Sequence, residues 1–126
     1  MTNLSITATA RSYPRLPFDA MKDAILGTSY ELSLVFVGRD RARSINQTTR
    51  TKSYAPNVLS FPLTDGAGEI FITPTVARTE AKKFNMTPTG YIGYLFIHGL
   101  LHLKGYDHGA SMDRLEATYC KKFNLK

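Results

Sequence analysis

The alternation of apolar and polar residues predicts where this chain forms strands and where it forms helices. In ELSLVFVG, Leu32, Leu34 and Phe36 alternate with smaller residues, which is typical of a strand. Stretches such as LPFDAMKDAIL instead repeat their apolar residues every three or four positions, which is typical of a helix. This pattern predicts strands at residues 4–10, 31–38, 58–62 and 69–73. It predicts helices at residues 16–26, 40–50, 74–85, 88–105 and 111–123.

Turn-forming and capping residues support the ends of these helices. Thr73 and Thr87 each precede a proline and are predicted to be N-caps. Gly27 and Gly105 follow the last apolar positions of two helices and are predicted to stop them. Ser111 is the candidate cap of the final helix.

The order of the predicted elements defines the fold class. The chain runs strand, helix, strand, helix, two strands and three helices, and the turn TDGAG predicts that the two consecutive strands form a hairpin. We expect an α+β fold with a single domain over residues 1–126, in which helices cover a small four-stranded mixed sheet. A chain of 126 residues can bury a sizeable apolar core without disulfides or a metal. The pattern does not reveal the order of the strands.

The chain is basic, with a formal net charge of +6. An excess of this size favours a polyanionic partner. Much of it lies between residues 39 and 52, where five basic residues accompany a single acidic one, Asp40. The basic residues are Arg39, Arg41, Arg43, Arg50 and Lys52. A solvated helix face gives the same pattern, so charge alone does not identify the partner.

The cysteine count and the apolar stretches indicate the cellular compartment of the protein. Cys120 is the single cysteine, which excludes an intrachain disulfide and favours a reducing, cytoplasmic setting. The longest apolar stretch, YIGYLFIHGLLHL, is too short to cross a bilayer and contains two histidines. The first residues contain no apolar run with a cleavage site. We therefore expect a cytoplasmic protein without membrane contact.

All three histidines lie within HGLLHLKGYDH, at residues 98–108. His98 and His102 are four residues apart, so a helix places both on one side. Gly105 lets the chain leave the helix and turn back, which allows His108 to supply a third nitrogen. Three protein ligands that leave one position open are typical of a catalytic zinc rather than a structural one. A single histidine on an apolar helix is more often a packed core or rim residue, so the metal interpretation depends on all three.

The residue after His98 distinguishes two kinds of hydrolase. Zinc peptidases with the motif H-E-x-x-H use the glutamate as general base. This chain has Gly99 at that position, so the usual peptidase route lacks its proton shuttle. Phosphodiester cleavage needs less from this position, because a cation can neutralise the charge that develops on the phosphoryl oxygens.

The histidine segment resembles the signature H-G-x-L-H-L-x-G-Y-D-H of the YbeY family of bacterial endoribonucleases. A second block, INQTTRTKSYAPNVLSFP, resembles the family pattern L-N-x-x-Y-R-x-K-D-x-P-T-D-V-L-S-F-P, and GEIFI resembles G-D-I-x-I. The chain departs from the family at Thr49, where tyrosine is usual, at Ser53, where aspartate is usual, and across the loop at residues 53–57. These departures concern substrate handling more than metal binding.

The resemblance implies a zinc-hydrolase-like fold and a metal-dependent, single-strand-specific endoribonuclease that acts in rRNA maturation and ribosome quality control. It implies that His98, His102 and His108 hold one Zn²⁺ per chain, although three imidazoles also accept nickel, copper or iron. It implies that Arg50 is the essential catalytic arginine, whose guanidinium can hold two phosphate oxygens at once. The implied partners are single-stranded RNA, rRNA and the small ribosomal subunit, and no DNA is expected.

Three further residues are candidates beside this site. Lys52 is either a second phosphate contact or a solvated loop lysine. Ser60 either points into the cleft and binds substrate or is an ordinary sheet serine. Asp107 either orients a ligand imidazole or caps its own turn. The nucleophile is either a water activated at the metal or the RNA 2′-hydroxyl, and the sequence does not choose between them.

Two other functions fit parts of the pattern. A metallohydrolase of another class, such as a peptidase, fits the histidine spacing but is opposed by Gly99. A non-catalytic, ribosome-associated RNA-binding protein with a structural metal fits the charge and the histidines. That protein would still bind RNA after His102→Ala and would never cleave it.

Overall fold

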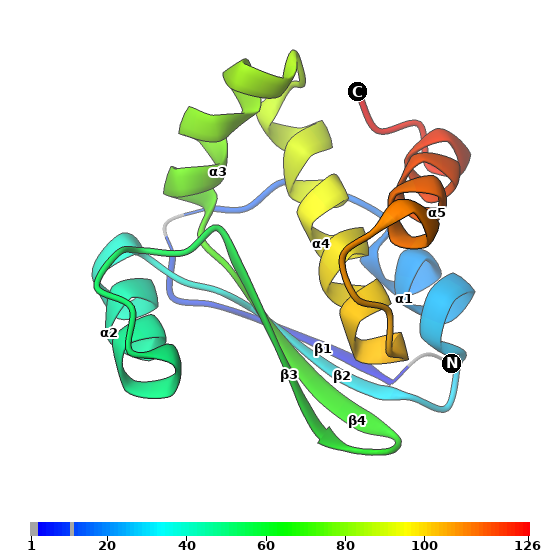
Figure 1. Cartoon of the computed structure of the whole chain (residues 1–126), viewed down its shortest axis with the longest axis horizontal. Coiled ribbons are helices and arrows are strands. Elements are labelled where there is room, and N and C mark those ends of the chain that lie inside the picture. The colour runs from blue at the N-terminus through cyan, green and yellow to red at the C-terminus, as the bar shows by residue number, and fades with distance from the viewer. Residues whose placement is uncertain (1–2, 11) are drawn as a thin grey trace.

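The computed structural model describes residues 3–10 and 12–126, and it has the predicted order of elements (Figure 1). The strands are β1 (Leu4–Ala8), β2 (Glu31–Phe36), β3 (Val58–Thr64) and β4 (Ala67–Ile72). The α-helices are α1 (Phe18–Leu26), α2 (Arg39–Arg50), α3 (Pro74–Ala81), α4 (Pro88–Lys104) and α5 (Ala110–Lys122). A short 3₁₀ helix, η1 (Lys82–Phe84), continues α3.

The strands form one mixed sheet in the order β1-β2-β4-β3. β1 and β4 both pair with β2 in parallel, whereas β3 pairs with β4 in the antiparallel sense. The predicted hairpin is therefore β3–β4, and the predicted α+β class with a four-stranded mixed sheet is confirmed.

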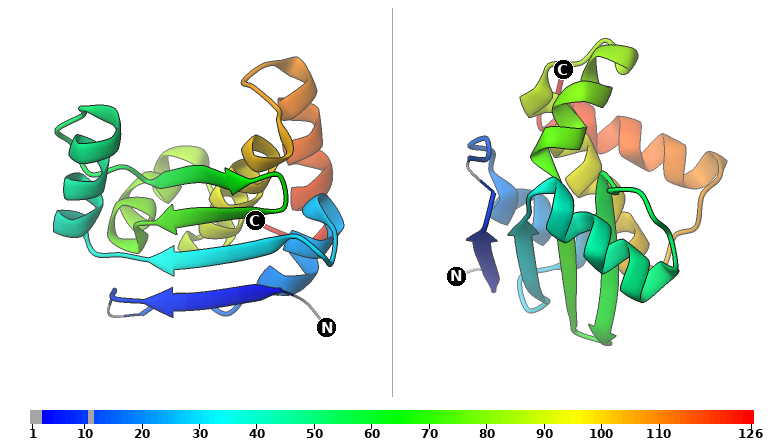
Figure 2. Two further views of the ribbon diagram at one scale, coloured as in Figure 1. Left: turned by 90° about the horizontal axis from the view of Figure 1, so that it is seen from below. Right: turned by 90° about the vertical axis from the view of Figure 1, so that its left-hand side faces the viewer.

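The core lies between one face of the sheet and the helices packed on it. Alternate residues of the two central strands point into it and are buried: Leu32, Leu34, Phe36, Ile70 and Ile72. The helix α4 lies at the centre of this layer, where it packs against α1, α3, α5 and both strands of the hairpin. Figure 2 shows α2 standing apart from these helices, at the end of the sheet where β2 ends. α2 therefore lies at one end of the sheet, whereas α4 packs on its face.

The caps agree with expectation in part. The hydroxyl of Thr87 accepts a hydrogen bond from the Gly90 N–H at 3.0 Å, as predicted for an N-cap. Gly105 ends α4 in the left-handed conformation, with φ of 111°. The prediction for Ser111 is wrong, because α5 begins at Ala110 and its N-cap is Gly109. Ser111 is therefore already helical, and its hydroxyl accepts from Arg114 at 3.4 Å.

Two further properties of the helices concern the membrane expectation and the single cysteine. Among the described residues, no helix has the length and apolar character that a membrane span requires. Burial, reinforced by the charge of Glu116, raises the pKa of the Cys120 thiol to about 11. The thiol is therefore protonated at neutral pH and packs against the core instead of acting as a nucleophile.

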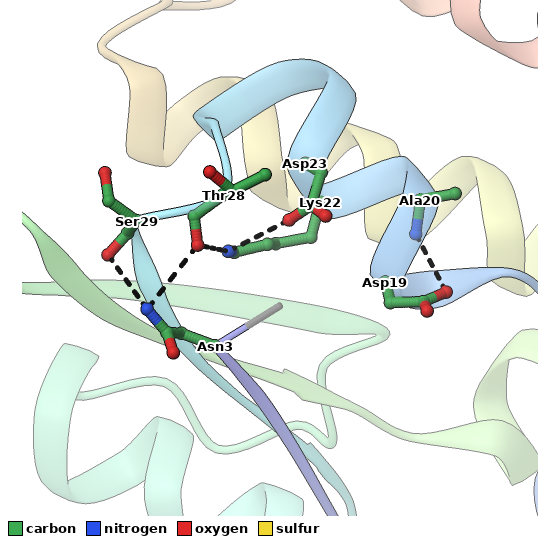
Figure 3. Close-up of polar contacts among 7 residues, drawn as sticks. All are labelled: Asn3, Asp19, Ala20, Lys22, Asp23, Thr28 and Ser29. Carbon is green, nitrogen blue, oxygen red and sulfur yellow. Dashed lines mark hydrogen bonds and ion pairs between the residues drawn. The ribbon is translucent and has the colours of Figure 1, made fainter. Parts of the chain in front are cut away.

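A buried lysine holds the turn between α1 and β2 (Figure 3). The side chain of Lys22 is fully buried, and its Nζ donates to the Thr28 carbonyl and to Asp23 Oδ1, both at 3.1 Å. Asn3 Nδ2 donates to the carbonyls of Thr28 and Ser29 from the start of β1. The ammonium group thus joins the end of α1 to the turn that leads into β2, and the Asn3 amide joins the same turn to the start of β1.

We expect Lys22→Met to lower the free energy of unfolding by about 1–3 kcal/mol, because it leaves the Thr28 carbonyl without this donor. Urea denaturation measures the change. Lys121→Met on the exposed side of α5 removes the same charge and is expected to change stability by less than about 0.5 kcal/mol. Equal effects of the two substitutions would contradict the structural role of Lys22.

Candidate metal centre and cleft

The three histidines converge at the end of α4. His98 and His102 lie one turn apart and are half-buried, and the left-handed Gly105 turns the chain so that the exposed His108 approaches them. The ring centroids are 4.5 Å apart for His98 and His102, 5.1 Å for His98 and His108, and 4.8 Å for His102 and His108. One nitrogen from each ring lies within 4.8 Å of the others. The predicted triad is therefore assembled, with ligand atoms close enough for one ion.

Hydrogen bonds fix the orientation of two of these rings. His98 Nδ1 lies 2.5 Å from Glu116 Oε2, and His102 Nδ1 lies 2.9 Å from the Tyr106 carbonyl. Both partners are acceptors, so each Nδ1 carries the proton and each Nε2 presents a lone pair. The two Nε2 atoms face each other at 3.1 Å.

Two facing lone pairs at this distance repel unless a positive charge lies between them. Two nitrogens bound to the same zinc at about 2.0–2.1 Å with tetrahedral angles lie about 3.3 Å apart. The observed separation of 3.1 Å is close to that value. The donor set and its spacing therefore fit a tetrahedral divalent ion.

The environment of His102 favours the neutral form of its imidazole. Burial lowers the pKa of His102, and the neighbouring rings of His98 and His108 lower it further. The Tyr106 carbonyl and Asp107 oppose this effect without cancelling it. Because only a neutral imidazole offers a lone pair, a lowered pKa favours the form that binds metal.

Glu116 contacts the triad and was not among the residues predicted from the sequence. It lies on α5, is 6% exposed, and accepts from the Tyr94 hydroxyl at 3.5 Å as well as from His98. Burial and the charge of Glu116 raise the pKa of Tyr94 to about 12, so that hydroxyl remains a donor. The available signal was the position of Glu116 four residues after Met112, on the buried side of α5.

We expect Glu116→Gln to weaken zinc binding about tenfold or more, because outer carboxylates orient ligand imidazoles and increase their basicity. Competition with a chelator at fixed pH measures the dissociation constant. Asp113→Asn removes one negative charge from the exposed side of the same helix and serves as the control. If both variants bind zinc equally well, Glu116 does not orient His98.

A cleft of about 440 Å³ contains the triad, and the side chain of Arg50 contributes a positive charge to its lining. It is lined by Arg50, Asn57, Val58, Leu59, Ser60, Phe61, His98, His102 and His108. Arg50 is the last residue of α2, whereas His98 and His102 lie on α4 and His108 lies in the loop after it. Its side chain is exposed and forms no hydrogen bond or ion pair with the described part of the chain. The guanidinium is therefore free to bind an anion in the cleft.

Of the other predicted residues, one lines the cleft and two do not. Ser60 lines the cleft, and its hydroxyl donates to the Gly99 carbonyl at 3.2 Å. Lys52 is exposed on the loop after α2 and does not line the cleft, and Asp107 is exposed without a hydrogen bond to a described histidine. The roles of Lys52 and Asp107 stay predictions, while Glu116 and the Tyr106 carbonyl are the groups that orient the imidazoles.

Asn46 is a second residue near the cleft to which the sequence assigned no role. It is fully buried on α2, and its Nδ2 donates to the Tyr54 carbonyl at 3.0 Å. Its own carbonyl accepts from the N–H of Lys52 at 3.3 Å. Asn46 therefore ties the loop that follows Arg50 back onto the side of α2.

The packing of α4 on β3 and β4 explains why residue 99 is glycine. A Cβ at Gly99 would lie 2.9 Å from Ser60 Oγ and 3.0 Å from Ile70 Cδ1, which is closer than ordinary contacts allow. The sheet thus approaches the helix backbone directly beside His98. The glutamate of a zinc peptidase has no room at this position.

We expect Gly99→Ala to destabilise the protein by about 1–2 kcal/mol, because the crowding cost exceeds the gain in helix propensity. Adding Ser60→Ala removes the closest neighbour and is expected to restore part of the loss, which thermal unfolding of both variants measures. Gly66→Ala is the control, because no atom of the described residues lies within 4 Å of its added carbon. Additive effects of the Gly99 and Ser60 substitutions would contradict the contact.

The fold and the site define a class of protein: an α+β domain with a cleft that is lined by three histidines and an arginine. A family model described as Endoribonuclease YbeY matches residues 7–124. The chain is 42% identical over 98 residues to Endoribonuclease YbeY of Bdellovibrio bacteriovorus. The aligned region covers 76% of this chain and 63% of that protein. It is 36% identical over 109 residues to Endoribonuclease YbeY of Neisseria meningitidis serogroup C, covering 78% of this chain and 63% of that protein. The chain belongs to the YbeY endoribonuclease family.

A solved structure supports the fold independently. The solution structure of TM1509 from Thermotoga maritima superposes with a TM-score of 0.70 and covers 95% of this chain and 88% of that one. The sequence identity is 24%, so this likeness concerns the fold alone. In the two curated relatives, the matched region spans 63% of the full length.

Proposed function

We propose that this chain is a metal-dependent endoribonuclease that cleaves single-stranded RNA, a hydrolase with one zinc ion held by His98, His102 and His108. The observation that carries the proposal is the cleft in which two oriented imidazole lone pairs face each other near Arg50, which has no side-chain partner among the described residues. A phosphodiester needs both features, because the reaction requires an activated nucleophile and neutralisation of phosphoryl charge. Family membership gives the same reaction class.

The chain's own residues bind and orient the substrate in this proposal. When bound, the metal supplies Lewis acidity and lowers the pKa of a water molecule. Arg50 binds the non-bridging oxygens of the scissile phosphate and stabilises their charge as it increases. The Ser60 hydroxyl donates to the Gly99 carbonyl, so its oxygen is left to accept a hydrogen bond from a substrate hydroxyl. Glu116 and the Tyr106 carbonyl hold His98 and His102 in the required tautomer.

The proposal extends to the natural setting of the reaction. We propose that the substrate is rRNA, that the protein contacts the small ribosomal subunit, and that it acts in the cytoplasm. A basic chain with a net charge of +6 suits an RNA partner. A peptidase is disfavoured, because Gly99 has no space for the glutamate that such enzymes use.

The test combines metal analysis with cleavage of end-labelled RNA. The purified protein is expected to contain about one equivalent of zinc and to cut a single-stranded RNA faster than the same sequence in a duplex. A 2′,3′-cyclic phosphate on the product identifies the 2′-hydroxyl as nucleophile, and its absence identifies water. A zinc-loaded sample that cleaves no single-stranded RNA would refute the proposal.

A further inference from the structure

We propose that Arg39 and Arg43 continue the site beyond the cleft, and that with Arg50 they form a track for the backbone of single-stranded RNA. We call these three residues the arginine row. The inference rests on the proposed function, because it takes the cleft around Arg50 to be the point of cleavage. It adds a binding surface that runs along α2, away from the metal centre.

Helix geometry places the three arginines in line. Successive residues of an α-helix are rotated by about 100°, so Arg39, Arg43 and Arg50 lie within about 40° of one another. Arg41 lies about 160° or more from all of them. The row extends about 16 Å along the axis, from the start of α2 to the cleft that Arg50 lines. A nucleic acid strand passes several phosphates over such a length.

The charges of the row are available to a ligand. All three arginines are exposed, and neither Arg39 nor Arg50 has a side-chain partner within the described part of the chain. Arg43 lies 3.7 Å from Asp40, but those side chains are 48% and 98% exposed, so the ion pair is weak. An arriving phosphate can therefore replace Asp40 with little loss. Because Arg50 already lines the cleft, the row connects directly with the reaction site.

An exposed tyrosine beside the row favours a single strand over a duplex. Asn46 lies between Arg43 and Arg50 along α2, and it bonds the Tyr54 carbonyl at 3.0 Å. This bond fixes the backbone of Tyr54 next to the row, while the residue remains 55% exposed. Unpaired bases stack on such aromatic rings, whereas paired bases keep their faces inside the duplex. The surface thus combines phosphate contacts with a stacking position.

The experiment compares substitutions on opposite sides of one helix. The double variant Arg39→Gln/Arg43→Gln and the control Arg41→Gln are tested with the zinc-loaded protein and a labelled 12-nucleotide single-stranded RNA, across a range of KCl concentrations. For the double variant we expect the slope of log K against log[KCl] to fall in magnitude by about 1.4, at about 0.7 for each lost phosphate contact. For Arg41→Gln we expect the parental slope. Equal slopes for the two variants would overturn the inference.

A second comparison tests the stacking position. Tyr54→Ala is expected to weaken binding of the single strand about tenfold and to leave binding of the matching duplex unchanged, whereas Tyr54→Phe keeps the parental affinity. If Tyr54→Ala weakens the binding of both RNAs equally, Tyr54 does not recognise unpaired bases and this part of the proposal is wrong.

Cleavage by the unmodified protein separates this inference from the proposed function. If that protein cuts RNA but the row variants bind like Arg41→Gln, only the track is wrong. If it binds RNA through the row but never cuts, the nuclease assignment is wrong and the track stands.

Discussion

Replacing Arg50 by alanine is expected to lower the rate constant of RNA cleavage by about 10²–10³-fold without changing the zinc content, because charge-stabilising donors at a reacting centre contribute this much. The expectation follows from the position of Arg50 on the rim of the cleft and from its lack of a partner among the described residues. A guanidinium that binds no side chain has no structural role to lose. The substitution should therefore affect the reaction and leave the fold intact.

Single-turnover cleavage of labelled RNA, together with elemental analysis, measures both halves of this expectation. Arg50→Lys retains the charge but loses the fork of two donors, so an intermediate rate is expected. Arg41→Ala removes an arginine from the opposite side of α2 and should cleave at nearly the parental rate. If Arg50→Ala cuts as fast as the parent, the catalytic role of this arginine is wrong.

Replacing His102 by alanine is expected to abolish cleavage and to remove the zinc from the purified protein. The substitution leaves two imidazoles of the triad and also removes the donor that bonds the Tyr106 carbonyl at the turn after α4. A catalytic zinc site has three protein ligands, and the two that remain are too few to hold the ion. The loss should therefore be complete, in contrast to the graded effect at Glu116.

Thermal unfolding with and without a chelator reveals whether zinc is bound. The parent should lose stability when its zinc is removed, by about 2.7 kcal/mol for a ligand present at 100 times its dissociation constant. His102→Ala should unfold at the same temperature in both conditions and should still bind RNA through its arginines. A variant without metal that still cleaves RNA would contradict the metal dependence of the reaction.

Sequence patterns captured the features that depend on neighbours along the chain. The alternation in Glu31–Phe36 and the helical repeat in Pro88–Lys104 predicted β2 and α4, because each period places apolar side chains on one side of the element. The four-residue separation of His98 and His102 and the turn at Gly105 predicted a convergent triad for the same local reason. The N-cap of α5 was misplaced by two residues, at Ser111 instead of Gly109, because helix ends are the least certain part of a local pattern.

The sequence by itself thus determined the class of fold, the three imidazoles and the arginine that the family pattern marks. Tertiary structure alone decided the strand order, the contact of Glu116 with His98 across 18 residues, and the close approach of β3 to Gly99. These features depend on which distant segments pack together, and packing is decided by the shape of the whole core rather than by any local period. The same packing brings Arg50 from α2 to the rim of a cleft whose histidines belong to α4 and the loop after it.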